Sequence, residues 1–187
     1  MQVITTSGFA EQTIHKSRFV ATAQFCDSEA AVVLFLRSLA SANPTAHHLA
    51  YAFRIKTTDG IIPRFSDAGE PSGTAGKPIL QMLEGRDLIN ICIGVLRYYG
   101  GINLGTGGLA RAYGGTAKQA LDRCLTAPFV EMQTIKLHLD YKQLDDFTRQ
   151  LHKLNGKFLT KEFSSRVLIT ASLPAQAVAT LTNRYQQ

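Results

Sequence analysis

The sequence lacks any long hydrophobic run and any secretory signal. No stretch of 18 apolar residues occurs in its 187 residues, so we expect no helix that crosses a bilayer. The first residues, MQVITTSGFAEQ, lack the basic segment followed by an apolar one that marks a secretory signal. We therefore expect a cytoplasmic protein with no membrane partner.

Cysteine is scarce, and no metal motif is present. Cys26, Cys92 and Cys124 are far apart and lie among apolar residues, which predicts buried, reduced thiols rather than a disulfide or a zinc site. Adjacent His47 and His48 point to opposite faces of a strand and cannot both bind one metal ion. We expect no metal, no cofactor and no assigned catalytic residue.

The charge is modest and spread along the chain. The net charge is +6 and the isoelectric point is near 9.4, but no basic run exists. Residues 1–128 and residues 129–187 each carry a net charge of +3. This excess of basic residues is compatible with an acidic partner, such as nucleic acid or a phosphorylated ligand. It is equally compatible with an ordinary protein surface that binds no such partner.

Strands and helices follow from local patterns. The apolar run Leu88–Leu96 predicts a strand covered on both faces. Asp27 or Ser28 can cap a helix that ends near Ala42, and Pro78 can start a short helix over Ile79–Leu83. The other strands predicted before residue 128 are Ser17–Cys26, His48–Thr57 and Ile61–Phe65.

The pattern changes after Ala127-Pro128, which predicts a first domain over residues 1–128 and a second over residues 129–187. The β-α-β-β-α order of the second part is typical of a small ferredoxin-like sandwich. We therefore expect an α+β fold. The elements predicted in the second part are Val130–Leu139, Gln143–Leu154, Lys157–Phe163, Val167–Leu173 and Ala175–Tyr185.

Glycine is concentrated in one region, because 13 of the 15 glycines lie between Gly60 and Gly115. In Tyr98–Ala112 (YYGGINLGTGGLARA), a buried strand leads through a glycine loop into a helix. Such a helix start directs backbone N–H groups and the positive end of the helix dipole at one point, which favours a phosphate or carboxylate. The alternative is that the glycines only permit a sharp turn and close packing. Gly114 and Gly115 also favour close approach by another molecule.

A second loop, Ser66–Pro78 (SDAGEPSGTAGKP), precedes this segment. Asp67 and Glu70 could hold a metal or act as acid and base, or Asp67 could form a turn while Glu70 pairs with Lys77. We interpret the loop as part of a binding surface from Arg64 to Lys118, the glycine-rich shelf. Its predicted binding residues are Arg64, Asp67, Glu70, Lys77, Arg97, Tyr98, Tyr99, Gly100, Gly101, Gly105, Thr106, Gly107, Gly108 and Arg111.

Two blocks of the chain resemble the signature of the YigZ/IMPACT family. They are Arg64–Pro78 (RFSDAGEPSGTAGKP) and Val95–Leu121 (VLRYYGGINLGTGGLARAYGGTAKQAL). The resemblance implies an IMPACT-type N-terminal domain, a β-α sandwich similar to a ribosomal-protein domain. It also implies a C-terminal domain similar to a ferredoxin-like domain of elongation factor G.

The functional implications of the resemblance are limited. The eukaryotic IMPACT protein restrains the kinase that senses amino-acid starvation, partly through an additional N-terminal domain that this chain lacks, so that activity is not carried over. Some members are described as proline dipeptidases, but this sequence shows no metallopeptidase ligand set.

These observations lead to three functional hypotheses. The first is a non-enzymatic protein that binds RNA or the ribosome and modulates translation. The second is an enzyme or sensor that binds a phosphorylated metabolite or nucleotide at the Gly105–Gly108 helix start. The third is a regulatory adaptor that binds another protein. Of these hypotheses, we favour a protein without enzymatic activity over an enzyme.

Overall fold

The computed structural model describes residues 1–185 and divides into two compact units, Met1–Phe129 and the residues from Val130 onward. Both units combine helices with antiparallel sheets, which confirms the expected α+β fold. Each unit has its own hydrophobic core.

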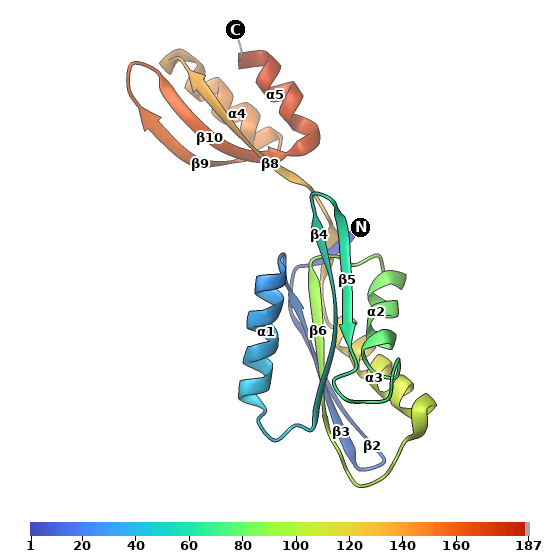
Figure 1. The fold of residues 1–187 in the computed structure, drawn as a ribbon. Helices are drawn as coiled ribbons and strands as arrows, with labels where there is room; N and C mark the ends of the chain where they lie inside the picture. Colours follow the sequence, from blue (N-terminus) through green and yellow to red (C-terminus); the bar gives the residue numbers. More distant parts are fainter. Residues whose placement is uncertain (186–187) are drawn as a thin grey trace. The chain divides into compact units, whose positions relative to one another are not determined.

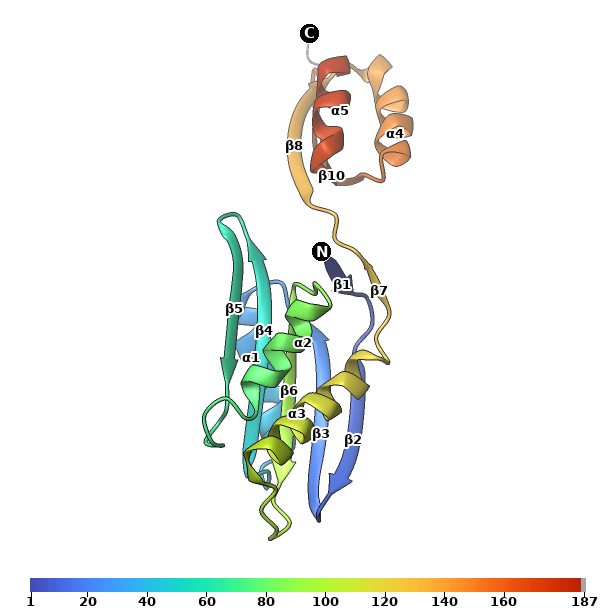
Figure 2. The same ribbon diagram turned by 90° about the vertical axis from the view of Figure 1, so that its right-hand side faces the viewer.

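A five-stranded antiparallel sheet forms the centre of the first unit. Its order is β2-β3-β6-β4-β5. Helix α1 covers one face of the sheet, and α2 and α3 cover the other (Figures 1 and 2). The elements are β2 (Gly8–Ile14), β3 (Ser17–Phe25), α1 (Glu29–Ala42), β4 (His48–Thr57), β5 (Gly60–Ser66), α2 (Gly76–Gly85), β6 (Ile91–Tyr98) and α3 (Gly105–Leu121). A separate two-stranded sheet pairs β1 (Gln2–Ile4) with β7 (Thr126–Pro128).

Strand β6 lies at the centre of the sheet and is buried on both faces, as its apolar composition predicts. Ile93 and Val95 pack in the core beneath α2 and α3, whereas Cys92 belongs to the cluster beneath α1. The strand begins three residues later than predicted, at Ile91. The reason is Asn90, which has a φ of 52° and accepts a hydrogen bond from the backbone N–H of Lys56 (2.9 Å).

The cysteines are free thiols, as predicted. Cys26 and Cys92 are buried beneath α1, and Cys124 is partly buried. Burial, with a smaller contribution from Asp27, raises the pKa of Cys26 to about 11, and burial also raises the pKa of Cys92. Both thiols therefore remain protonated and unreactive at neutral pH.

The second unit contains a three-stranded antiparallel sheet in the order β8-β10-β9. The β-α-β-β-α order expected of a ferredoxin-like sandwich is confirmed, with a 3₁₀ turn before each helix. Phe147, Leu151 and Tyr185 from the helices pack against alternate residues of β8 and β10. The elements are β8 (Met132–Leu139), α4 (Leu144–Lys153), β9 (Lys157–Phe163), β10 (Val167–Pro174) and α5 (Val178–Tyr185).

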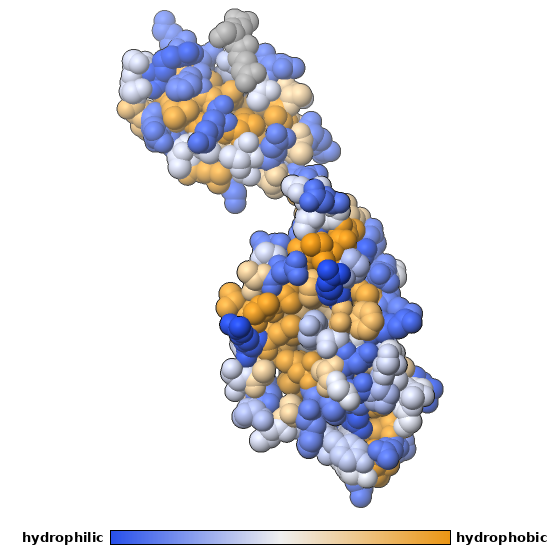
Figure 3. Space-filling model, viewed as in Figure 1, coloured by the Kyte–Doolittle hydropathy of each residue, from blue (hydrophilic) through white to orange (hydrophobic). Residues whose placement is uncertain are grey.

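The surface of the first unit carries apolar side chains over α1 and the strands beside it (Figure 3). Val33 and Leu34 of α1 and Phe65 of β5 are the large apolar side chains exposed there. None of the helices between residues 1 and 185 has both the length and the apolar character needed to cross a membrane.

Candidate anion-binding site

The loop between β5 and α2 is organised by the carboxylate of Asp67. One oxygen accepts the backbone N–H of Gly73 (2.8 Å), and the other accepts those of Ala75 (2.9 Å) and Gly76 (2.8 Å). Burial raises the pKa of this carboxyl, but the backbone N–H bonds together outweigh burial and hold the pKa below its usual value. Asp67 therefore caps the start of α2.

Glu70 lies at the centre of a second cluster, and its side chain is only 4% exposed. Its Oε1 accepts hydrogen bonds from Nη1 of Arg97 and from the hydroxyl of Tyr113, each at 2.7 Å. Nε2 of His48 lies 3.8 Å from the same oxygen. Glu70 thus pairs with Arg97, and the expected pairing with Lys77 is not found among the ion pairs of residues 1–185.

Strand geometry explains this cluster. His48 of β4 and Arg97 of β6 are directly paired across the sheet, so both side chains point to the face covered by α2 and α3. Nδ1 of His48 donates to the carbonyl of Ala68 (2.8 Å), which ties the loop to the sheet. Arg97 is 5% exposed, and its Nε is buried without a hydrogen-bond partner.

The first turn of α3 lies beside this cluster. Helix α3 begins at Gly105, one residue before the predicted cap Thr106, and the preceding residue Leu104 supplies no side-chain cap. Gly105 has a φ of 69°, a left-handed conformation that favours glycine. Residues 105–107 are exposed, and within residues 1–185 no loop carbonyl or side chain accepts a hydrogen bond from their backbone N–H groups.

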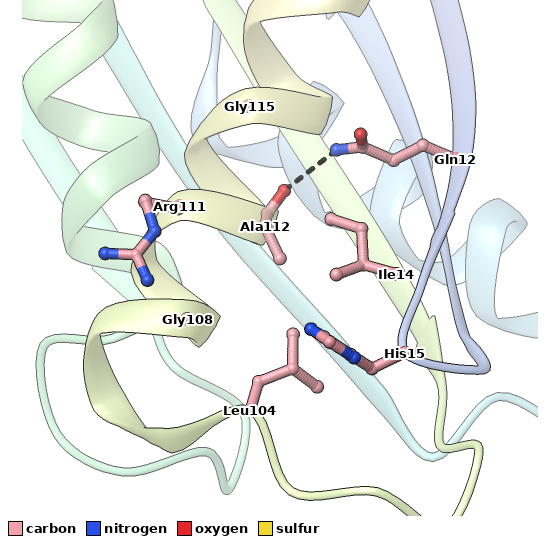
Figure 4. Close-up of a pocket in the computed structure, with 8 residues that line it drawn as sticks. All are labelled: Gln12, Ile14, His15, Leu104, Gly108, Arg111, Ala112 and Gly115. Atoms are coloured by element: carbon pink, nitrogen blue, oxygen red, sulfur yellow. Dashed lines mark hydrogen bonds between the residues drawn. The ribbon is translucent and has the colours of Figure 1, made fainter.

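Two pockets flank this turn, and Leu104 lines both. The first, of about 340 Å³, is lined by Glu70, Pro71, Arg97, Asn103, Leu104, Gly105, Thr106 and Leu109. The second, of about 270 Å³, is lined by Gln12, Ile14, His15, Leu104, Gly108, Arg111, Ala112 and Gly115 (Figure 4). Arg111 lies over the first turn, with Nη1 3.4 Å from the position that a Cβ on Gly107 would occupy. We call the first turn of α3 with Glu70 and Arg97 the anion site.

The structure brings some predicted residues together and separates others. Tyr99 lies beside the anion site, with its ring centroid 5.1 Å from the Arg97 guanidinium carbon. Gly100 packs against the backbone of Lys16, and Gly101 has a φ of 84°, so both shape the turn. Lys77 is exposed in the first turn of α2.

Arg64 and Tyr98 do not join the anion site. Arg64 lies on edge strand β5 and lines a pocket with residues of α1. Tyr98 follows Arg97 in β6, so its side chain points to the α1 face, where its hydroxyl donates to Asn43 (2.7 Å). Lys118 is near the far end of α3 and pairs with Asp122. The expected continuous shelf from Arg64 to Lys118 is therefore divided between separate surfaces.

The close approach expected at Gly114 and Gly115 is made by the protein itself. A Cβ on Gly114 would lie 3.5 Å from Cβ of Pro78 in α2, and one on Gly115 would lie 3.6 Å from Nε2 of Gln12 in β2. Four further residues lie at the two pockets or contact Glu70 although the sequence did not indicate them, namely Gln12, His15, Asn103 and Tyr113. Tyr113 occupies an apolar position of α3, and only its hydroxyl bond to Glu70 connects it to the site.

Comparison with known proteins places the chain in a family. The Impact N-terminal domain matches residues 15–121, which contain the anion site. The chain is 38% identical over 169 residues to the IMPACT family member YigZ of Escherichia coli (strain K12), covering 90% of this chain and 83% of that protein. This chain belongs to the IMPACT family.

Other relatives support this assignment. The IMPACT family member YvyE of Bacillus subtilis (strain 168) is 35% identical over 159 residues, covering 85% of this chain and 72% of that protein. A crystal structure of a hypothetical protein matches with 35% identity and a TM-score of 0.74, covering 98% of this chain and 89% of that one. The structure of the two-domain translational regulator Yih1 matches with 27% identity, covering 62% of this chain and 46% of that one. Its TM-score of 0.39 is too low to indicate a shared fold.

Proposed function

We propose that this IMPACT-family protein binds RNA, free or within the ribosome, through the anion site and thereby acts in the regulation of translation. The observation that carries the proposal is the uncapped and exposed first turn of α3, which opens into the pocket lined by the buried Glu70–Arg97 pair. A helix N-terminus of this kind suits a phosphate group. We place the protein in the cytoplasm, where translation occurs.

Charge and surface favour a chain of phosphates over a single anion. Arg111 lies over the first turn of α3, and Tyr99 stands exposed beside Arg97. Aromatic and arginine side chains at the edge of a phosphate site suit stacking with the bases of a single strand. The positive net charge adds a weak, sequence-independent attraction.

The role we propose is binding rather than catalysis. Both oxygens of Asp67 accept backbone N–H groups, and Oε1 of Glu70 is held by Arg97 and Tyr113. Within residues 1–185, no group of three or more His, Cys, Asp or Glu residues could hold a metal ion. Asp67 is therefore explained by a structural role, whereas Glu70 has only one of its two oxygens engaged within the protein.

The proposal is tested by placing a carboxylate on the anion site. Thr106→Asp puts a negative charge at an exposed position in the first turn of α3, where it favours the helix but repels phosphate. Fluorescence anisotropy with labelled single-stranded RNA should show lost binding, with the folded state retained. Thr58→Asp, on the exposed turn between β4 and β5, changes the net charge equally and should bind as the wild type does.

Salt dependence provides a second readout. If two phosphates are contacted, affinity for a single strand should fall about sevenfold between roughly 50 and 200 mM salt. Unchanged RNA binding by Thr106→Asp, or no RNA binding by the wild type at low salt, would refute the proposal.

A small phosphorylated ligand is the second candidate, because the pocket of about 340 Å³ falls within the range of small-molecule sites. This candidate predicts that one compound in a panel of phosphates and nucleotides raises the melting temperature. Exposed Val33, Leu34 and Phe65 around α1 favour a third candidate, a protein adaptor. It predicts a co-purifying protein that survives nuclease treatment.

A further inference from the structure

The two oxygens of Glu70 differ in their surroundings. Oε1 accepts from Arg97 and Tyr113, whereas no protein hydrogen bond within residues 1–185 reaches Oε2. Oε2 is also not sealed, because the fully buried side-chain N and O atoms without partners in this part of the chain are Nε of Arg54 and Nε of Arg97. Glu70 lines the pocket at the first turn of α3, so Oε2 is the side-chain acceptor of this residue that a ligand in the pocket could engage.

The anion site therefore offers two opposite kinds of contact. The N–H groups at the start of α3 and the Thr106 hydroxyl can donate hydrogen bonds to an anion. Oε2 of Glu70 can only accept one. A phosphate without a neighbouring donor would place its negative charge next to the carboxylate of Glu70 and would give Oε2 no hydrogen bond. The site therefore suits a ligand in which a hydrogen-bond donor lies next to the anionic group.

RNA has this combination at every nucleotide and DNA does not. The ribose 2′-hydroxyl is a donor next to the 3′-phosphate, and it distinguishes RNA from DNA. We propose that Glu70 makes the protein selective for RNA over DNA: Oε2 accepts the 2′-hydroxyl while the adjacent 3′-phosphate binds the first turn of α3. This inference rests on the proposed function, and it adds a specificity-determining residue to it.

The shape of the surface favours a strand over a free nucleotide. The pockets on the two sides of the turn share Leu104, so a ligand longer than one nucleotide can cross the turn and enter both. Arg111 is among the residues that line the second pocket, and its guanidinium extends to the side of α3 away from Ile14 and His15 (Figure 4). A strand that crosses the turn could place its next phosphate or base there.

The test compares three labelled single strands of identical sequence on the full chain: RNA, DNA and 2′-O-methyl RNA. A lost hydrogen bond to a charged group corresponds to an affinity change of about tenfold or more. RNA should therefore bind about tenfold more tightly than either analogue. The 2′-O-methyl strand matters because it keeps the ribose but removes the donor. Adenosine 3′-monophosphate should compete far more weakly than RNA of the same concentration.

Glu70→Gln tests the residue itself. With its oxygen held by Arg97 and Tyr113, the amide would present an NH₂ donor to the pocket, and this donor can bond to a hydroxyl or to an ether oxygen. The preference for RNA over 2′-O-methyl RNA should therefore fall to about one. Glu84→Gln removes the same charge from an exposed position on α2 and should retain the preference. The thermal melt of Glu70→Gln shows whether this variant folds. If it does not fold, the comparison of the three strands on the wild type still tests whether the protein recognises the 2′-hydroxyl.

The failures of the two proposals are distinguishable. Equal affinity for RNA and DNA, or 2′-O-methyl RNA binding as tightly as RNA, overturns the role of Glu70 and leaves RNA binding in place. Adenosine 3′-monophosphate competing as well as RNA overturns the strand as the ligand. No binding of any strand overturns the proposed function and this inference together.

Discussion

Residue pairs that are distant in sequence build the anion site. Glu70 and Arg97 are 27 positions apart, and their side chains are 4% and 6% exposed. A buried ion pair of this kind is strongly destabilised when one partner is removed, because the other charge remains buried. Arg97→Ala is therefore an unsuitable test of binding, and gentler substitutions are needed.

Tyr113→Phe is such a substitution. It removes the hydroxyl that donates to Glu70 and keeps the ring, so we expect a loss of about 1.5 kcal/mol in the free energy of unfolding. Urea denaturation measures this change. Tyr98→Phe removes a hydroxyl that donates to the neutral side chain of Asn43, and we expect a loss of about 0.5 kcal/mol. Equal effects of the two variants would contradict the charged contact to Glu70.

At the residue level, the start of the helix at the candidate site could be predicted from the sequence, but the pairing of its side chains could not. The glycines and Thr106 could be assigned to a helix start because the strand–loop–helix pattern is local. The pairing of Glu70 with Arg97 could not, because it depends on which residues of β4 and β6 share a sheet face. Lys77, seven positions from Glu70, was the nearer candidate in sequence and is exposed instead.

At the scale of the secondary-structure element, Asp67 determines where α2 begins. It lies nine positions before Gly76 and accepts the backbone N–H of that residue. We expect Asp67→Ala to lower the free energy of unfolding by about 2–3 kcal/mol, since three backbone donors lose a charged acceptor. Asp67→Asn, which keeps one carbonyl oxygen, should lose less.

The effect of Asp67 should depend on pH in a defined direction. Its folded pKa lies below the ordinary value of 3.8, so its stabilisation is complete above that value and is lost as the pH falls through the folded pKa. The stability difference between wild type and Asp67→Ala should thus be constant near neutral pH and shrink below about pH 4. A difference that grows on acidification would contradict this role.

Two glycines of the first unit should respond oppositely to alanine. A Cβ at Gly115 of α3 meets only ordinary contacts, and alanine is the better helix former, so Gly115→Ala should stabilise by about 0.5–1 kcal/mol. A Cβ at Gly100 would collide with the backbone of Lys16, so Gly100→Ala should destabilise by about 2 kcal/mol or more. Thermal melts of both variants measure the effects. Stabilisation by Gly100→Ala would show that the turn packs differently.

Most helices and strands could be predicted because their signals are local. Strands β4 and β9 have the predicted bounds, and Ser28, one of the two predicted caps, caps α1 by accepting the N–H of Ala31 (3.3 Å). Strands β1 and β7 could not be predicted, because each has three residues and forms by pairing with segments that are distant in the sequence. Helix α2 begins two residues before Pro78 because its cap comes from Asp67.

At the scale of the whole molecule, the two units have separate cores, and the anion site lies within the first. We therefore expect residues 1–129 to fold alone and to bind RNA with an affinity within about threefold of the full chain. A shorter fragment, residues 1–121, lacks β7, the partner of β1, and should have a lower melting temperature. Loss of RNA binding by folded residues 1–129 would place binding outside the first unit.

The most direct measurement is a nuclear magnetic resonance titration of the ¹⁵N-labelled full chain with short single-stranded RNA. If phosphate binds the start of α3, the amide resonances of Gly105, Thr106 and Gly107 should shift most, because these residues are exposed and the helix start has no side-chain cap. Saturable shifts elsewhere in the chain, with these three resonances unchanged, would contradict the account.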